Sequence, residues 1–324
     1  MMTRRIGMVA MLSATIVAGA HGQASLLPRM LSAPFPEDMV AASAKSVVAW
    51  VNNAKGVRNV WVASAPDYKG RQLTAYATDD GQEISELSLS PDGATVFYVR
   101  GGGANRRGEI PNPTSDPAGQ EQNIWRVSLT GGAAAKVAAG TSPEISPKGD
   151  LVVFASKGQI WSAPVVGAGA PQALIKVRGG ASNLVWSPDG SMIAFASRRT
   201  DHGFVGIYAF ASHAIRWLDP TYDFDSSPVW SPDGKQIAFI RIPAGFDPPL
   251  FGPIRESPPW SIRVANAATG VSRQVWMADR GQGSVLHGVV GPSLLWGADD
   301  RLVFPWEKDG WSHLYSVSAS GGGA

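Results

Sequence analysis

The sequence predicts an all-β protein, a β-propeller of four-stranded blades, and three observations carry this prediction. A Ser-Pro-Asp-Gly turn or a variant of it recurs between two short apolar runs, and a third run follows each pair. The copies are spaced at about one blade length, since four strands in roughly 40–45 residues is the pattern of a propeller blade. The composition agrees, because 37 glycines and 24 prolines in 324 residues indicate many short elements joined by turns.

The repeated turn has a physical explanation. Proline presets φ at the second position of a turn, and aspartate can accept a hydrogen bond from the amide two residues on. Glycine then adopts a positive φ. The flanking runs are rich in Val, Ile, Phe and Trp, which suit half-buried strands. Each copy therefore predicts strand, tight turn, strand. The copies begin at Ser90, Ser146, Ser187, Ser231 and, in decayed form, Gly297.

The copies lie 56, 41, 44 and 66 residues apart. The two long intervals contain loop-rich insertions at 101–122 and 243–259, which we expect between the second and third strands of their blades. Alternating strand direction then places both insertions on one rim and the Ser-Pro-Asp-Gly turns on the other. Segments 47–51 and 59–62 supply a first blade without the motif, so about six blades are predicted. We interpret the sixth as incomplete; its completion by a strand from 25–39 is the alternative.

The domain organisation begins with a signal peptide at 1–24, followed by the propeller at 25–324. Two arginines precede an apolar run at 6–20, and an Ala-Gly-Ala site lies at 18–20. The run is shorter than the roughly 20 residues that span a membrane. We therefore expect a periplasmic or secreted protein, with no membrane association after signal removal.

Charge and cysteine content exclude several function classes. Removing the signal takes away two positive charges and leaves 26 basic and 26 acidic side chains, so no electrostatic feature favours nucleic acid. The absence of cysteine excludes a disulfide scaffold, a thiolate zinc site and a cysteine nucleophile. The histidines lack metal-ligand spacing, and we expect neither a metal nor a cofactor. The pair Arg198-Arg199 is interpreted as a solvated turn.

The twelve tryptophans are the most distinctive apolar residues. Many of them stand at equivalent positions in successive blades, which predicts packing between blades rather than ligand stacking. These are Trp61, Trp125 and Trp161 on third strands and Trp186, Trp230 and Trp296 on first strands.

The chain resembles the N-terminal propeller of the prolyl oligopeptidase family of serine peptidases, most closely its bacterial dipeptidyl-peptidase-IV-like and acylaminoacyl-peptidase-like members. The resemblance covers 34–324 and is most specific at 56–62, 79–85, 258–264 and 302–311. The Ser-Pro-Asp-Gly repeat alone is shared with TolB-like and other propellers. In that family an α/β-hydrolase domain with a Ser-Asp-His triad follows the propeller. The resemblance implies a propeller that gates a peptide substrate and docks on such a domain, here absent.

The family's catalytic residues map to no position in this chain. No serine has glycine at both −2 and +2, since Ser142 and Ser320 have only one each. We therefore expect the chain alone to be catalytically silent and interpret it as truncated before the hydrolase domain. It also lacks the Glu-Glu pair with which the family's dipeptidyl peptidases hold a substrate's amino terminus, so acylaminoacyl, prolyl or general oligopeptidase specificity stays open.

The rim that carries both insertions is the predicted functional surface. Loops carry function while blades provide the scaffold, so we expect this rim to face the hydrolase domain and help admit peptide. Two alternatives stay open: ordinary connecting loops, and a stand-alone periplasmic TolB-like propeller that binds a protein partner. The candidate rim residues are Arg255, Glu256, Trp260, Trp306, Glu307 and Trp311.

Overall fold

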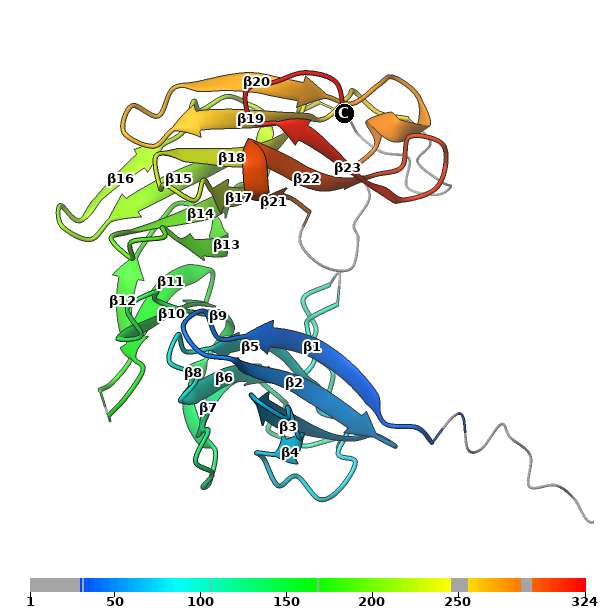
Figure 1. The fold of residues 1–324 in the computed structure, drawn as a ribbon, viewed down its shortest axis with the longest axis vertical. Helices are drawn as coiled ribbons and strands as arrows, with labels where there is room; N and C mark the ends of the chain where they lie inside the picture. The colour runs from blue at the N-terminus through cyan, green and yellow to red at the C-terminus, as the bar shows by residue number, and fades with distance from the viewer. Residues whose placement is uncertain (1–29, 31, 106, 168, 246–255, 287–292) are drawn as a thin grey trace, which may run out of the picture.

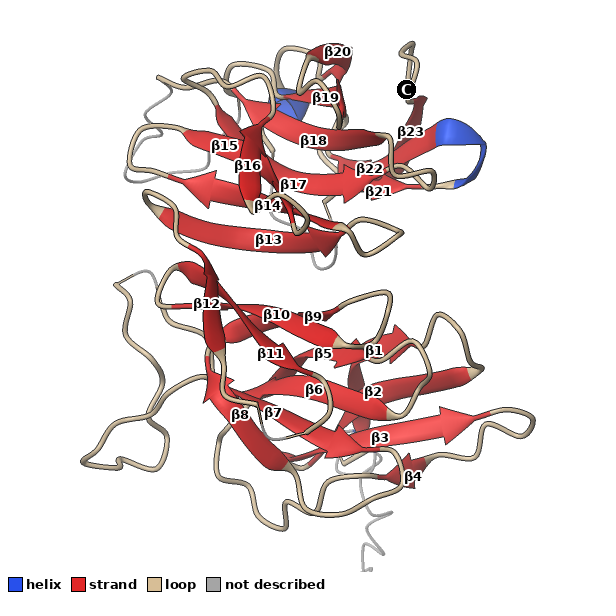
Figure 2. Cartoon of the chain, turned by 90° about the vertical axis from the view of Figure 1, so that its left-hand side faces the viewer, coloured by secondary structure: helices blue, strands red, loops and turns tan. Residues whose placement is uncertain are grey.

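Six small antiparallel blades follow one another around a C-shaped arc in the computed structural model (Figure 1), and the fourth and fifth are joined into one eight-stranded sheet. The predicted all-β propeller of four-stranded blades is confirmed. Figure 2 shows blades 1–3 as the lower group and blades 4–6 as the upper group, with strands dominating both. The structure describes residues 30, 32–105, 107–167, 169–245, 256–286 and 293–324, so the predicted signal peptide at 1–24 lies outside the described residues.

The first three blades follow chain order. Blade 1 consists of β1 (Phe35–Ala41), β2 (Val47–Ala54), β3 (Val57–Ser64) and β4 (Arg71–Gln72). Blade 2 consists of β5 (Ile84–Leu89), β6 (Thr95–Arg100), β7 (Asn123–Ser128) and β8 (Ala135–Ala139). Blade 3 consists of β9 (Thr141–Ile145), β10 (Leu151–Ser156), β11 (Gln159–Pro164) and β12 (Gln172–Ile175).

The last three blades continue the pattern. Blade 4 consists of β13 (Gly180–Trp186), β14 (Met192–Arg198), β15 (Gly203–Ala209) and β16 (Ala214–Trp217). Blade 5 consists of β17 (Phe224–Trp230), β18 (Gln236–Ile242), β19 (Ser261–Asn266) and β20 (Ser272–Met277). Blade 6 consists of β21 (Leu295–Trp296), β22 (Arg301–Trp306) and β23 (His313–Ser318). Two 3-10 turns, η1 (Gln282–Ser284) and η2 (Ala298–Asp300), flank β21.

Blade 6 has three strands within the described residues, as expected for an incomplete blade. The alternative, completion of blade 6 by 25–39, does not hold for the described part of that segment. Residues from Phe35 onward instead form β1, which pairs antiparallel with β2 in blade 1.

The first strand of each blade lines the concave side of the arc. Strand β1 contacts β5, β5 contacts β9, β9 contacts β13, β13 contacts β17, and β17 contacts β21. Blades 4 and 5 are further joined by one parallel bridge between Gly203 and Phe224. Both insertions lie between second and third strands, after β6 and after β18. Because strands alternate in direction, all such connections share one rim with the connections that enter the next blade.

The predicted chemistry of the Ser-Pro-Asp-Gly turn is present. In blade 4, the Ser187 hydroxyl donates to Asp189 Oδ1 at 2.6 Å and accepts from the Met192 amide at 2.9 Å. Asp189 Oδ1 also accepts from the amide of Ser191, two residues on, at 3.0 Å. The Ser187 hydroxyl is the main cause that lowers the pKa of Asp189 to about 2. Gly190 has φ +67°, which an L side chain would resist.

The same turn is built with one variation in blade 3. Lysine stands at the aspartate position there, and Asp150 replaces the missing carboxylate by accepting from the Ser146 hydroxyl at 2.5 Å. The turns at Ser90 and Ser231 repeat the 2.6 Å hydroxyl–carboxylate bond of blade 4. These bonds hold the turns short, so this rim has little loop surface.

The core consists of five apolar clusters, each lying between two consecutive blades. An aromatic side chain on the second strand is central to each cluster and has no solvent exposure. These five are Tyr98, Phe154, Phe195, Phe239 and Phe304. The equivalent residue of blade 1 is Trp50, which stays half-buried because no described blade precedes it.

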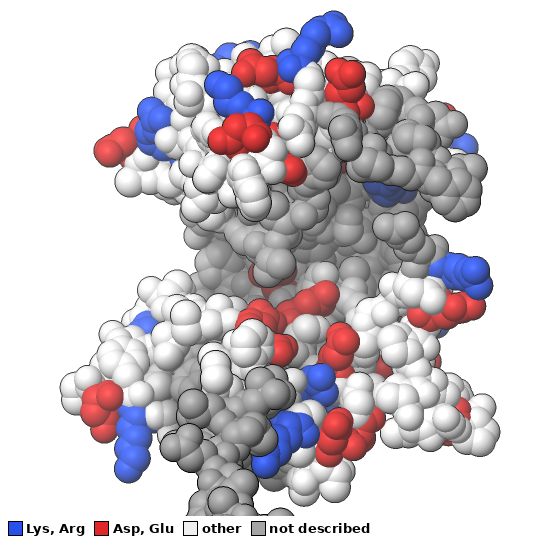
Figure 3. All heavy atoms as spheres, turned by 90° about the vertical axis from the view of Figure 1, so that its right-hand side faces the viewer, with Lys and Arg blue, Asp and Glu red and all other residues white. Residues whose placement is uncertain are grey.

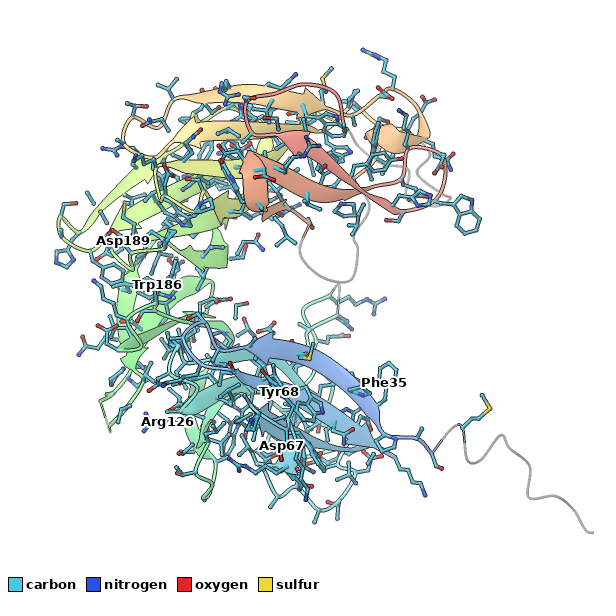
Figure 4. All side chains as sticks on the ribbon, viewed as in Figure 1. Phe35, Asp67, Tyr68, Arg126, Trp186 and Asp189 are labelled. Carbon is cyan, nitrogen blue, oxygen red and sulfur yellow. The ribbon has the colours of Figure 1, made fainter. Side chains whose placement is uncertain are left out.

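Polar bridges cross the same junctions. The indole of Trp186 donates to the Glu144 carbonyl of the preceding blade at 3.0 Å, and Trp230 repeats this bond one blade later. Arg126 donates to the Val165 carbonyl of the following blade at 2.9 Å. Figure 4 shows Trp186 and Arg126 at these junctions. The prediction that first-strand tryptophans pack between blades therefore holds for Trp186 and Trp230.

Candidate functional site

The concave wall carries a repeated backbone irregularity. The pairing register shifts once in the first strand of blades 1–5. At each shift one non-glycine residue has a left-handed φ of 50° to 54°. Such a backbone is sparsely populated by L residues and is best tolerated by small polar ones. The five residues are Asp38, Glu86, Ser142, Asn183 and Ser227.

Two of these five residues, Asp38 and Glu86, have carboxylates that accept a hydrogen bond from the backbone at the register shift of the next blade. Asp38 Oδ2 accepts from the Leu87 amide at 2.9 Å, and Glu86 Oε2 accepts from the Ser142 amide. Although the side chain of Glu144 is partly open to solvent, surrounding protein raises the pKa of its carboxyl group to about 7, and the nearby Glu86 charge adds to this. The concave wall therefore carries carboxyl groups, and that of Glu144 loses its proton at a higher pH than an ordinary glutamate does.

Acidic side chains gather on the lower half of the molecule in the view onto the open side of the arc (Figure 3). Blades 1–3 build this half, and their first strands supply Asp38, Glu86 and Glu144. Among the described residues, no group of three or more His, Asp or Glu side chains is arranged to hold a metal ion.

The predicted rim residues that the structure describes lie at the end of the second insertion and around the end of β22, and both segments contact the blade 5–6 connection. The end of the second insertion docks on η1, where the Ser257 amide donates to Ser284 Oγ and its hydroxyl donates to the Ser284 carbonyl, both at 2.9 Å. The loop after β22 reaches the same connection, with Lys308 Nζ 3.6 Å from Asp279 Oδ2. The described end of the insertion, the described part of the blade 5–6 connection around η1 and the blade 6 loop thus form one packed unit.

Two of the predicted rim tryptophans belong to the core of this unit. Trp260 and Trp306 are only 1% and 5% exposed. Both indoles donate to the carbonyl of Gly283, at 3.3 Å and 2.8 Å, and both rings contact Trp276 edge to face at 4.8–4.9 Å. This corrects their placement: burial satisfies each indole N–H, so neither ring is available to a ligand.

The other predicted rim residues differ in exposure. Trp311 is 75% exposed, Glu256 is exposed and Glu307 is half-buried. Arg255 lies outside the described residues. Trp311 and the two glutamates are therefore the predicted side chains that reach the surface of this rim.

A second feature of the rim lies at blades 3–5 and was not predicted as a site. Arg198 ends β14, Arg199 follows it, and the connection into β13 brings Arg178 to the same place. Together they border a pocket of about 660 Å³. The sequence signal was the adjacent arginine pair, which was interpreted as a solvated turn.

Solved structures resemble this chain in fold. An oligogalacturonate lyase in complex with manganese has a TM-score of 0.59 at 15% identity, with 86% of this chain and 76% of that chain covered. A puromycin-hydrolyzing peptidase of Mycobacterium tuberculosis has a TM-score of 0.58 at 16% identity, covering 88% of this chain and 44% of that one. TolB from Acinetobacter baumannii has a TM-score of 0.50 at 15% identity, covering 86% and 63%.

The chain is a β-propeller. At these identities the likeness shows the fold alone, and it includes a peptidase as well as a TolB. The chain spans less than half the length of the peptidase it matches. Its sequence matches no protein-family model and no curated protein. None of the described helices is long and apolar enough to cross a membrane.

Proposed function

We propose that this chain is the substrate-gating and docking propeller of an exported serine peptidase of the prolyl oligopeptidase kind. Residues 1–24 are its signal peptide, and its catalytic α/β-hydrolase domain is a separate part that docks on the loop rim. The observation that carries the proposal is the asymmetry of the two rims. One has only short hydrogen-bonded turns, while the other holds both insertions and the packed loops around η1.

The similarity in fold to a peptidase supports this proposal, because that peptidase is about twice as long as the matched segment. The exposed ring of Trp311 supports it as well, since large exposed aromatics are typical anchors of protein interfaces. A TolB-like role as a stand-alone partner-binding propeller is the rival, in line with the similarity to TolB.

Site-directed photo-crosslinking in the native host tests the proposal. A photoreactive residue at 311 should crosslink to an α/β-hydrolase domain bearing a G-x-S-x-G serine. The same residue at 148, an exposed position on the opposite rim, is the matched control and should not. A crosslink from 311 to a protein without a hydrolase serine would favour the TolB-like role. Equal crosslinking from both positions, or none from 311, would contradict docking at this rim.

The proposal also requires the chain itself to be inert. We expect a fluorophosphonate probe, which labels activated serines, to leave the purified chain unlabelled. Stoichiometric labelling would place a nucleophilic serine inside the propeller and refute the division of labour between the two parts.

A further inference from the structure

The pocket on the loop rim at blades 3–5 is lined by three arginines. Its volume is about 660 Å³. One acidic side chain, Asp201, lines it with the three arginines, and its Oδ1 lies 2.7 Å from Nδ1 of its neighbour His202. The charged and titratable residues that line the pocket are Arg178, Arg198, Arg199, Asp201 and His202.

Strand pairing brings these residues together from distant positions in the sequence. Gly180 at the start of β13 pairs with Arg198 at the end of β14. Gly179 has φ +83°, and a Cβ atom on it would stand 2.2 Å from the Arg198 carbonyl oxygen. Only glycine therefore permits this close approach. The Ser197 hydroxyl donates to the Arg178 carbonyl at 3.1 Å and fixes the connection.

Aromatic rings support two of the guanidinium groups. Arg198 lies over the ring of Phe224 at 5.0 Å, and Arg199 lies over the ring of Phe204 at 4.6 Å. Stacking of this kind restricts an arginine without using its N–H donors. The rings come from blades 4 and 5, so the pocket sits at a blade junction. The fold thus restrains both cations at the border of the pocket.

The donors of these arginines are not consumed within the described protein. Arg199 Nε is buried and has no hydrogen-bond partner there. Its NH1 group has only the His202 ring nitrogen at 3.3 Å. No carboxylate of the described residues pairs with Arg178 or Arg198. Arg178 and Arg198 are exposed, and buried donors such as Arg199 Nε are almost always satisfied in folded proteins, so all three side chains have N–H donors to offer an acceptor that enters from solvent.

We propose that this pocket binds an oxyanion, of the kind carried by a peptide carboxylate or a phosphate group. Guanidinium forks match the two oxygens of a carboxylate or phosphate and hold them by charge-assisted hydrogen bonds. Arg198 and Arg199 supply the stacked forks, and Arg178 closes the pocket from the adjoining connection. The site is independent of the proposed peptidase role, because a propeller of either kind could bind the anion.

Isothermal titration of the purified chain tests the proposal. The probes are the tripeptide Ala-Ala-Phe as free acid, the same peptide as its amide, and inorganic phosphate. We expect the free acid or phosphate to bind and the amide not to bind. The stronger of the two anions identifies the source of the oxyanion. Binding should weaken as salt rises, since the contacts are ionic.

Variants locate the site. Arg198→Gln should weaken anion binding at least about tenfold, the size expected for a lost charge-assisted hydrogen bond. Arg198→Lys should lose less, because it keeps the charge but not the fork. Arg280→Gln is the matched control, an exposed arginine without a partner among the described residues, and should leave binding unchanged. Failure of both anions to bind the wild-type chain, or equal binding by Arg198→Gln, would overturn the proposal whatever the crosslinking shows.

Discussion

The aromatic residue at the centre of each blade junction gives the sharpest test of the packing. Phe195 has no solvent exposure and lies among Val153 of blade 3 and Tyr208 of its own blade. Its ring is 5.7 Å from that of Trp217, edge to face. Phe195→Ala would leave a cavity at the junction, and such changes cost about 3–5 kcal/mol. For a domain of about 300 residues, with an unfolding entropy of roughly 2.1 cal/mol/K per residue, that corresponds to a fall in Tm of roughly 5–8 °C.

Trp50 is the matched control, because it holds the equivalent position in blade 1. The Trp50 side chain is only half-buried. Trp50→Ala should therefore lower the free energy of unfolding by about 1 kcal/mol, although tryptophan is the larger side chain. Differential scanning fluorimetry of both variants against wild type measures the contrast. Equal falls in Tm would refute the inference that the junctions, rather than the individual sheets, hold the stability.

Three other changes test single interactions. Asp225→Asn should cost about 3 kcal/mol in urea unfolding, because it breaks the buried two-bond pair with Arg241. Asp225→Leu with Arg241→Met should cost less; an equal or larger loss would contradict this. Glu144→Gln should flatten the pH profile of Tm. The carboxyl pKa of Glu144 is about 7 in the folded protein, against an ordinary value of 4.5. The wild type therefore loses stability as the pH rises from 4.5 to about 7, and the variant should not show this loss. Ser187→Ala should cost about 1 kcal/mol by removing the hydrogen bond that the half-buried Met192 amide makes, measured by thermal unfolding, and an unchanged Tm would show that the turn does not need its hydroxyl.

The sequence predicted those parts of the fold that depend on local chemistry. The turn at Ser187 forms from residues within five positions of one another, so its bonds follow from the motif alone. The placement of both insertions between second and third strands followed from the same repeat. The bulges of the concave wall were missed, although a polar residue such as Glu86 or Asn183 stands four positions before the motif serine. That signal is weak because the residue type changes from blade to blade.

The site was less predictable because its contacts join distant segments. We predicted Trp260 and Trp306 on the surface of the rim, yet both indoles donate to the Gly283 carbonyl. That carbonyl lies in the blade 5–6 connection, where the sequence has no repeat pattern. Arg198 was interpreted as solvated and is exposed, but its neighbour Arg178 lies twenty residues earlier and is brought beside it only by the β13–β14 register, so the sequence could not predict the pocket. Charged residues that are far apart in the sequence can be recognised as one site only when the strand pairing is known.

The division of labour between the two rims follows from strand alternation. A four-stranded blade returns its chain to one rim twice, between the second and third strands and again on entering the next blade. Long loops can therefore accumulate on that rim without disturbing the short turn that sets the register on the other. The arginine pocket and the exposed Trp311 both use this freedom, at blades 3–5 and at blade 6. Because the pocket and Trp311 sit on different blades, loss of anion binding in Arg198→Gln should leave crosslinking at 311 intact.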